Sequence, residues 1–493
     1  MAVKQPNMKA ADSPIVMKAG DTAARETAAQ KAVEATINET PEVASALAAR
    51  GIPATYDSNN RAYVELAGTT DEIHAIGEYL TSYQPARNAF LNALVNRIGL
   101  TIVTSKLYRN PWAVFKRGYL EFGDSIEEIF VNLADVHGFY PEGAEDTFAK
   151  RELPDVRAVF HRMNFQKFYK TTVSAQQLRQ AFLSWTGVSD LIARIIESLY
   201  TSANTDEYYV MRYFLAKCLL NGYIGSVEIP AIGKDNAIDI ATQFQYMSDL
   251  FQYQSTKYNM AGVTTHTDFE DQYFIVTAKF KATMNMNVLA TAFNLEYREF
   301  QARMITVDTF TDFDWVRMDA LFTDPATGQL DPNYHRFKQE EIALLETVPA
   351  VLVSRDWWMV LDNYVESAQW FNGEGLYWNH WHHVWKTISC SPFGQAAAFT
   401  PTAPTITSVT VTPATATLSK GADLQLSAAV VGTGIVNQGV QWKVTGGAAS
   451  GTTVTNGGYL HVAANETATT LTVTATSIQD GTKTAESTIT VTV

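Results

Sequence analysis

Cysteine is scarce in this sequence, because its 493 residues include only two, Cys218 and Cys390. Both lie in apolar stretches, so we expect buried thiols rather than a disulfide, and folding in a reducing compartment. No window holds the ~18 consecutive apolar residues of a membrane-spanning helix. The first thirty residues are alanine-rich and charged, without the apolar core of a signal peptide. We therefore expect a protein that neither spans a membrane nor uses a classical secretion signal.

The short motifs of common enzymes are missing as well. The chain has no dinucleotide or phosphate-binding glycine pattern, no G-x-S-x-G and no H-E-x-x-H. His380 and His382 would share one face of a strand, as metal ligands do, but no cysteine or acid follows at a ligand-like spacing. Asp356 and Glu366 lie near tryptophans, yet scattered carboxylates of this kind occur in any long chain. We predict no enzymatic activity, no cofactor and no metal site.

Positive charge is in deficit. The 37 Lys and Arg residues against 51 Asp and Glu residues give a net charge of −14. Phosphate would be repelled by such a chain, so broad nucleic-acid binding is not expected. Basic residues between positions 151 and 170 alternate with acids, which favours complementary charge between subunits over phosphate binding. These basic residues are Arg151, Arg157, Arg162, Lys167 and Lys170.

The length and the changes in composition indicate more than one domain. Residues 1–82 are small and polar, with an alanine-rich stretch at 22–50 that predicts a thin helix ended by Gly51, Ile52 and Pro53. A solvated arm and an arm that orders against a neighbouring subunit both fit this composition, and we favour the second.

The region from Pro111 to Lys170 has strand-like alternation but few core-building runs. Tyr119–Phe122 alternates, and Ile126–Val131 favours a strand, while glycines, prolines and charges punctuate the rest. About sixty residues of this character are unusual inside a compact domain. An extended hairpin lying on a partner explains them better than an ordinary small sheet layer.

A helical run from Ser174 to Gly222 is predicted to be the spine of the molecule. Ser174 is a possible N-cap, and Thr205 followed by two acids predicts the start of the last helical part. Its apolar residues recur at helical spacing, and Gly222 suits the position just after a helix end. The stripe consists of Tyr208, Met211, Leu215, Cys218 and Leu219.

Beyond the spine, strands and helices mix up to Phe399. Strands are expected at Gln272–Phe280, Val351–Val360 and the aromatic Leu376–Trp385. Thr400–Pro404 is a linker, after which charge nearly vanishes and alternating Thr and Val residues predict a series of short strands. The spacing of these strands up to residue 493, with one central Trp442, is typical of an immunoglobulin-like sandwich without the usual cysteine pair.

Several short stretches form an ordered set, namely Asn96–Leu100, Ser125–Phe130, Arg151–Val156 running to Phe160 and His161, Ala181–Trp185, Asp206–Tyr208, Gly375–Asn379 and His383–Trp385. In their order and approximate spacing, over about residues 90–400, these stretches resemble the major capsid proteins of phi-29-like podophages. The C-terminal region resembles a bacterial immunoglobulin-like group 2 domain, which that family also carries.

The resemblance implies an α+β fold of the Hong Kong 97 capsid type, followed by the all-β sandwich. It places an N-terminal arm at 1–82 and a capsid core at 83–399. Within that core lie an extended loop at about 112–170, the spine at 174–222, an axial domain at about 223–347 and a return to the peripheral domain at 348–399. The linker at 400–404 and the immunoglobulin-like domain at 405–493 follow.

The resemblance also implies a function in the phage head. Copies of the chain would assemble as pentamers and hexamers into the icosahedral shell that encloses the double-stranded DNA, with portal and scaffold proteins as further partners. Contacts between subunits are expected from Phe122, Glu127, Glu128, Arg151, Glu152, Asp155, Arg157 and Arg162. The sandwich is expected to project outward and to bind neighbouring sandwiches or host-wall glycans.

The resemblance places the chain in the virion capsid, after assembly in the host cytoplasm. The alternative function is a cell-surface adhesin or carbohydrate-binding protein with an immunoglobulin-like module.

Overall fold

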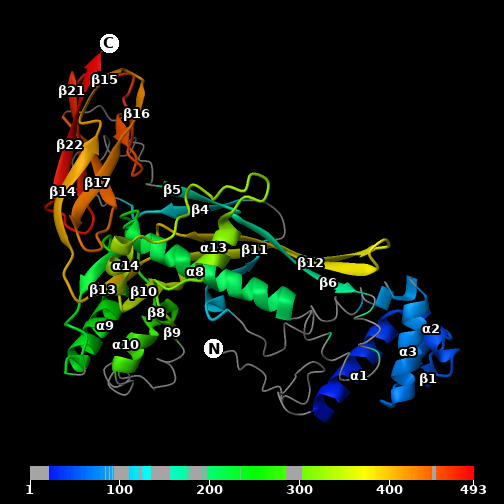
Figure 1. Ribbon diagram of the computed structural model, residues 1–493. Coiled ribbons are helices and arrows are strands. Elements are labelled where there is room, and N and C mark those ends of the chain that lie inside the picture. The colour runs from blue at the N-terminus through cyan, green and yellow to red at the C-terminus, as the bar shows by residue number, and fades with distance from the viewer. Residues whose placement is uncertain are drawn as a thin grey trace, which may run out of the picture.

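The computed structural model describes residues 22–83, 85–87, 89–90, 93, 110–120, 125–134, 156–174, 176, 182, 191, 197–233, 235–284, 303–446 and 451–492. Figure 1 shows a helical module at one end of the molecule, a central body built on two sheets, and a β-domain at the opposite end. The long helix α8 runs through the centre of the body. Each of the three parts is described below with the residues that hold it together.

A five-stranded sheet forms one half of the central body, in the order β7-β13-β10-β8-β9. Its strands are β7 (Gly225–Glu228), β8 (Gln272–Thr277), β9 (Met304–Val307), β10 (Ala350–Ser354) and β13 (Ala396–Thr400). The middle strand β10 is buried along its whole length. Ala350 and Leu352 pack with α9 (Ala237–Phe251) and α10 (Ala278–Thr283), while Val351 and Val353 pack with α8. Burial on both faces explains why this strand is continuously apolar.

This sheet contains strands from both sides of the boundary expected between the axial domain, up to residue 347, and the return to the peripheral domain, from residue 348. Strands β7, β8 and β9 come from before that boundary, whereas β10 and β13 come from after it. The strand expected at Gln272–Phe280 also ends early, at Thr277. The Thr277 side chain accepts a hydrogen bond from the Phe280 backbone N–H and so caps the start of α10.

A four-stranded sheet forms the other half, in the order β3-β11-β12-β6. Its strands are β3 (Lys116–Tyr119), β6 (Phe165–Ser174), β11 (Trp358–Asn372) and β12 (Tyr377–Cys390). The β11–β12 hairpin is long, and its tip extends toward the helical module (Figure 1). The aromatic strand expected at Leu376–Trp385 is confirmed and continues to Cys390. Ser174, expected to cap a helix, is the last residue of β6.

Helix α8 (Ser202–Leu220) forms the last part of the spine predicted at 174–222, and all members of its apolar stripe are buried. Most of the first part of that prediction, between residues 175 and 196, lies outside the described residues. Its end is also confirmed: Gly222 has φ +70°, the Tyr223 N–H donates to the Cys218 carbonyl at 2.9 Å, and the Gly222 N–H donates to the Leu219 carbonyl at 3.2 Å. This paired pattern is a Schellman motif. The predicted start at Thr205 is wrong, since η2 (Glu197–Thr201) leads directly into α8 and the Thr205 hydroxyl donates to the Thr201 carbonyl inside the helix.

Helix α8 carries charges that are buried together with its apolar residues. Glu207 is 1% exposed and forms ion pairs with Lys386 of β12 and, at 3.4 Å, with Lys116 of β3. Both lysines also face Asp362 of β11, at 2.9 and 2.7 Å. Asn110 adds a hydrogen bond of 2.7 Å to Glu207. This Glu207 network therefore fastens the helix to three strands of the four-stranded sheet.

Two further buried charges fasten α8 on its other side. Asp206 pairs with Arg317 of α13 (Trp315–Phe322). Arg212 pairs with Asp308, and its guanidinium lies 4.2 Å from the centre of the Phe313 ring. Pairing of each buried charge avoids the large cost of leaving it unsolvated. Helix α14 (Gln339–Glu346) packs beside this region.

The N-terminal region differs from the expected arm, because residues 22–82 form a folded module. Its elements are α1 (Thr22–Glu39), α2 (Pro41–Ala48), β1 (Ala54–Tyr56), β2 (Ala62–Val64) and α3 (Thr70–Ser82). Valine, isoleucine and leucine side chains from these elements share one buried core, which includes Val173 of β6 and Trp378 of β12. Alanine dominates the composition, but a few larger apolar residues at the right spacing suffice for this small core.

The C-terminal β-domain comprises strands β14 to β22 in sheets of two, four and three strands. The strands are β14 (Thr405–Thr412), β15 (Thr415–Ser419), β16 (Asp423–Gln425), β17 (Ser427–Thr433), β18 (Val440–Thr445), β19 (Thr453–Val454), β20 (Tyr459–His461), β21 (Thr470–Ser477) and β22 (Thr484–Thr492). The series of short strands expected here from the alternating pattern is present. Trp442 is half-buried at the edge of the apolar core rather than central to it.

The C-terminal β-domain is docked firmly on the central body. Ile435 is 2% exposed and belongs to the main core beside α8. Its carbonyl accepts hydrogen bonds from the backbone N–H and the hydroxyl of Ser226, at 3.1 and 2.7 Å. The Gln438 N–H donates to the Gly222 carbonyl at 2.8 Å, and the Gln479 amide donates to the Ser226 carbonyl at 3.2 Å. Backbone contacts of this kind hold the β-domain in one orientation.

Both cysteines are free thiols, as expected from the sequence. Cys218 is buried in α8, and Cys390 is half-buried at the end of β12. Burial raises the pKa of the Cys218 thiol. No helix within the described ranges is long and apolar enough to cross a membrane.

The Glu207 network leads to a first prediction. Glu207→Gln leaves Lys386 buried beside too little negative charge and should lower the free energy of unfolding by about 3–5 kcal/mol. Chemical denaturation of the unassembled protein measures this loss. The exposed Glu340→Gln in α14 is the control and should change stability by less than about 0.5 kcal/mol. Glu207→Leu combined with Lys386→Met should recover much of the loss, and a Glu207→Gln protein as stable as the wild type would contradict the assigned role.

Candidate assembly surface

The region expected to be an extended loop contains a two-stranded hairpin, hereafter the β4–β5 hairpin. Strand β4 (Ser125–Val131) pairs antiparallel with β5 (Val156–Arg162), from the pair Ser125 and Arg162 to the pair Val131 and Val156. Among the strands that the structure describes, neither β4 nor β5 pairs with a strand of another sheet. The outer parts of the expected loop behave differently, because Trp112 and Phe115 are buried in the main core and β3 and β6 are strands of the four-stranded sheet.

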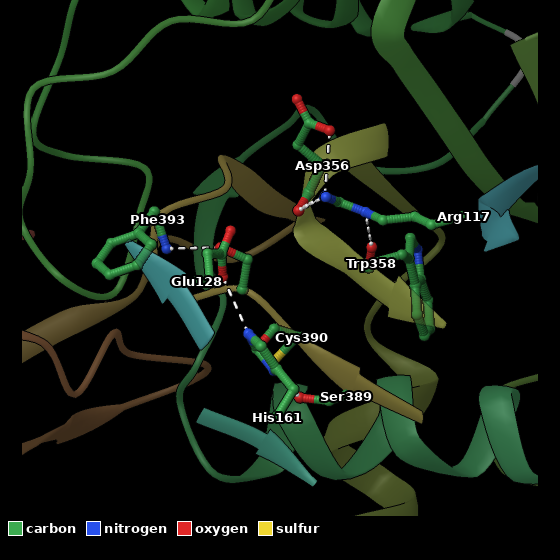
Figure 2. Close-up of polar contacts among 9 residues, drawn as sticks. Arg117, Glu128, His161, Asp356, Trp358, Ser389, Cys390 and Phe393 are labelled. Carbon is green, nitrogen blue, oxygen red and sulfur yellow. Dashed lines mark hydrogen bonds and ion pairs between the residues drawn. The ribbon is translucent and has the colours of Figure 1, made fainter. Parts of the chain in front are cut away.

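The inner face of the hairpin is held by polar contacts near its base (Figure 2). His161 is buried, with Nε2 at 3.0 Å from the Glu128 carboxylate and Nδ1 at 2.7 Å from the Ser389 hydroxyl. The Ser391 hydroxyl donates to Glu128 at 2.9 Å. Glu128 and His161 thus connect β4 and β5 to the end of β12. Since a lone two-stranded hairpin is marginally stable, these contacts help to fix its position.

Farther from the base, the inner face meets other parts of the chain. The Phe130 ring stacks on Phe393 with ring centres 5.2 Å apart. The Thr264 N–H donates to the Asn132 side chain at 3.3 Å. Arg157 donates to the Ala261 carbonyl. The hairpin therefore rests on the loop around residues 255–267 as well as on β12.

Arg117 anchors the strand that leads into the hairpin, as Figure 2 also shows. Its guanidinium donates to the backbone carbonyls of Trp358 at 2.9 Å and Asp356 at 2.7 Å. The Asp356 carboxylate lies 3.1 Å from the same group. The planar, multidentate guanidinium suits such a set of acceptors and fixes β3 against the start of β11.

The outer face of the hairpin is exposed and largely apolar. Phe160 is 62% exposed and Ile129 is 60% exposed, and Val131 and Val156 lie next to them in the same register. Glu127 and Arg162 lie at the edge of this set. We call these six residues the hairpin outer face. A contiguous apolar patch with a charged rim is typical of a protein–protein contact site.

A second exposed apolar surface lies on the four-stranded sheet. It consists of Phe168, Lys170, Tyr364, Glu366, Trp370, Trp381, His383 and Trp385, which share one face by strand register, and we call it the aromatic face. Trp370 is 70% exposed. Other members of the aromatic face interact with each other: the centres of the Tyr364 and Trp385 rings are 4.8 Å apart, and the Lys170 ammonium lies 5.7 Å from the centre of the Trp381 ring. Aromatic residues with one acid and one base are again typical of an interface.

The residues that the sequence suggested for subunit contacts separate into three groups. Glu127 and Arg162 are exposed on the hairpin outer face. Glu128 and Arg157 point inward and bond within the chain. The remaining four, namely Phe122, Arg151, Glu152 and Asp155, lie outside the described residues.

Sequence reasoning missed the apolar members of both surfaces. Period-two alternation predicted the strand at Ile126–Val131, but not which of its two faces would be covered. Both Glu127 and Glu128 are acids, and contacts with His161 and with Ser391, far along the chain, turn only Glu128 toward the body. Neighbouring residues of a strand point to opposite faces, so an inward His161 and Val159 would have predicted that the Phe160 ring points outward.

The comparison with known proteins now identifies the family. Residues 53–400 match the phi29-like phage major capsid protein family. The chain belongs to this family. It is 33% identical over 415 residues to the major capsid protein of Bacillus phage B103, covering 83% of this chain and 85% of that protein. With the major capsid protein of Bacillus phage PZA it shares 31% identity over 411 residues, which cover 82% of this chain and 84% of that one.

Among solved structures, the capsid of Staphylococcus phage Andhra is similar to 61% of this chain and 86% of its own, at 15% identity and a TM-score of 0.48. Family membership, rather than this structural likeness, makes the chain a major capsid protein of the virion and a structural protein instead of an enzyme. The adhesin alternative is not favoured. As a phi29-like major capsid protein, the chain belongs to a family whose members assemble into multimeric capsid shells.

His380 and His382, considered above as metal ligands, lie on the opposite side of β12 from the aromatic face and are buried. His382 contacts the Ser367 hydroxyl at 3.1 Å and the Tyr200 ring at 4.4 Å between centres. Within the described part of the chain, no group of three His, Cys, Asp or Glu side chains is placed to hold a metal ion. Burial lowers the pKa of both histidines to about 4.

These buried histidines predict acid sensitivity of this capsid protein. Above pH 6.5 both are neutral whether folded or unfolded, so they do not affect stability there. As the pH falls from 6.5 to 4 the unfolded chain binds protons that the folded chain does not, and each histidine should cost up to about 3 kcal/mol of stability.

The variants His380→Leu and His382→Leu test this. Each should flatten the dependence of unfolding free energy on pH in that window, as measured by denaturation at several pH values. The exposed His266→Leu is the control. An unchanged pH dependence in both variants would contradict the assignment.

Proposed function

We propose that the chain builds the phage head through a head-to-tail contact, in which the hairpin outer face of one subunit covers the aromatic face of the next. The observation that carries this proposal is the presence of two separate exposed apolar surfaces on one subunit. Two different surfaces make a heterologous contact, which closes into rings when the rotation between subunits allows it. Pentamers and hexamers of the icosahedral shell are such rings.

The proposed fold is of the Hong Kong 97 capsid type. In that assignment α8 is the spine helix, the β4–β5 hairpin is the extended loop, the five-stranded sheet belongs to the axial domain and the four-stranded sheet belongs to the peripheral domain. Strand order and the position of α8 between the two sheets support this assignment. The helical module at residues 22–82 takes the place of a simple arm.

The proposed partners follow from the same architecture. The shell encloses double-stranded DNA, and the net charge of −14 keeps the protein from adhering to it. Portal and scaffold proteins complete the head. The C-terminal β-domain, assigned as immunoglobulin-like group 2, lies on the outside, since its threonine-rich surface needs no partner to be soluble.

The contact itself is tested with charges placed in each surface. Phe160→Asp and Trp370→Asp should each leave a folded, soluble protein, because both side chains are mostly exposed, but should abolish shells by burying an unpaired charge in the contact. Electron microscopy and sedimentation after coexpression with scaffold protein measure this. Val316→Asp, which changes an exposed apolar residue on α13, is the control.

Mixing the two defective proteins gives a sharper test. Phe160→Asp retains an intact aromatic face and Trp370→Asp retains an intact hairpin outer face, so one contact forms between the two proteins. The surfaces left free in this dimer are the two defective ones, so no third subunit can bind. The mixture should therefore contain dimers and no shells. Normal shells from either variant alone would refute the contact, and a mixture of monomers would show that the two surfaces do not meet each other.

The C-terminal β-domain is proposed to bind host-wall glycans through the exposed face of its three-stranded sheet. Tyr459 is exposed there, and the Asp423 carboxylate lies 2.6 Å from the His461 ring. An exposed aromatic ring beside polar groups is suited to a sugar. Tyr459→Ala shells should lose at least about tenfold in glycan affinity relative to wild-type shells on a glycan array. Wild-type shells that bind no glycan would end this proposal.

A further inference from the structure

A contact between the C-terminal β-domain and the β4–β5 hairpin has a consequence for assembly. The Arg157 guanidinium donates to the Ala261 carbonyl and also reaches the side-chain oxygen of Asn456, in the amide orientation that satisfies both groups. These three residues come from the hairpin, the central body and the C-terminal β-domain. One arginine therefore joins all three parts at a single point.

Arg157 makes this contact far from the base of the hairpin, where it bears on the direction of the hairpin. It pairs with Phe130, next to the last described pair of the hairpin, Val131 and Val156. The base of the hairpin is already held by Glu128 and His161. Farther along the strands, Arg157 adds to the Phe130–Phe393 stack and the Asn132–Thr264 hydrogen bond. These attachments help to set the angle at which the hairpin leaves the body, because within the described residues the hairpin pairs with no other sheet.

Asn456 is itself held rigidly. It lies in the turn between β19 and β20, where the Thr455 N–H donates to the Tyr459 carbonyl and the Gly458 N–H to the Thr455 carbonyl, both at 2.9 Å. Gly458 has φ +79°, and a Cβ atom there would come within 2.3 Å of the Leu426 carbonyl oxygen. Glycine suits this position because it allows both the positive φ and the close approach, and the two hydrogen bonds close the turn that presents Asn456.

The C-terminal β-domain in turn is fixed on the body through Ile435, Gln438 and Gln479, as described above. A rigid path therefore runs from the main core, through the β-domain, to the far part of the hairpin. A guanidinium presents several donors in one plane, so it can bind the Ala261 carbonyl and the Asn456 amide together.

We propose that Asn456 is a positioning residue for assembly: by binding Arg157 it sets the direction of the β4–β5 hairpin, and with it the angle between neighbouring subunits. The C-terminal β-domain then acts on shell geometry from within its own subunit, whatever else it binds outside. This inference rests on the proposed contact through the hairpin outer face. Its molecular part, the fixing of the hairpin, is measurable in unassembled subunits.

The variant Asn456→Ala removes the acceptor, and Asn456→Asp retains one in a residue equally suited to a turn. Asn465→Ala, at an exposed asparagine of the same domain, is the matched control. In unassembled full-length protein, backbone amides of residues 125–131 and 156–162 should exchange hydrogen about tenfold faster in Asn456→Ala, as expected for loss of a charge-assisted hydrogen bond. Asn456→Asp and Asn465→Ala should match the wild type.

Electron microscopy of assembled particles gives the second measurement. Asn456→Ala should produce a broader range of shell diameters, together with open or irregular particles, and Asn456→Asp should restore uniform shells. Arg157→Lys approaches the same contact from the hairpin side, and should resemble Asn456→Ala because a lysine lacks the planar set of donors.

The outcomes separate this inference from the proposed function. Hydrogen exchange in Asn456→Ala that equals the Asn465→Ala control would overturn the positioning role, even if Phe160→Asp abolishes shells. Faster exchange with uniform shells would overturn the effect on shell geometry. If Phe160→Asp assembles normally, the proposed contact fails, and the exchange measurement still decides whether Asn456 fixes the hairpin.

Discussion

The buried Glu207 network is the constraint on which the central body depends. One carboxylate on α8 faces lysines from β3 and β12, and Asp362 of β11 balances the remaining charge. Charges removed from water must find partners at the right distance, so the helix has one acceptable rotation and one acceptable height above the sheet. Apolar packing alone tolerates small shifts, whereas this network does not. The spine is therefore located by electrostatics and stabilised by its apolar stripe.

From that fixed spine, contacts extend to both ends of the molecule. The β11–β12 hairpin carries Lys386 and Asp362 of the Glu207 network near its base and contacts the helical module near its tip, where Trp378 enters the core of the module. The end of α8 at Gly222 touches the C-terminal β-domain through Gln438. The parts of the subunit share buried residues, so they are not loosely linked domains. We expect a force applied at one subunit contact to be transmitted through the whole subunit instead of bending it between its parts.

The sequence predicted elements that depend on local pattern and missed those that depend on distant partners. The stripe of α8, the strand at Ile126–Val131 and the β-domain strands follow from periodicity, and each is present. A helix was predicted at 22–50, where α1 and α2 lie, but the folding of residues 22–82 into a module was missed because its core also draws on distant residues such as Trp378. Likewise, the opposite orientations of Glu127 and Glu128 follow from alternation, but only the positions of His161 and Ser391 decide which of them faces the body.

The position of Ile435 has a consequence for the order of events during synthesis. This side chain completes the core beside α8, yet the ribosome makes it more than two hundred residues after that helix. A growing chain that already contains α8, both sheets and the β4–β5 hairpin still lacks part of its central packing. Completion of the central core is therefore coupled to completion of the β-domain, because Ile435 is supplied only when that domain has been made.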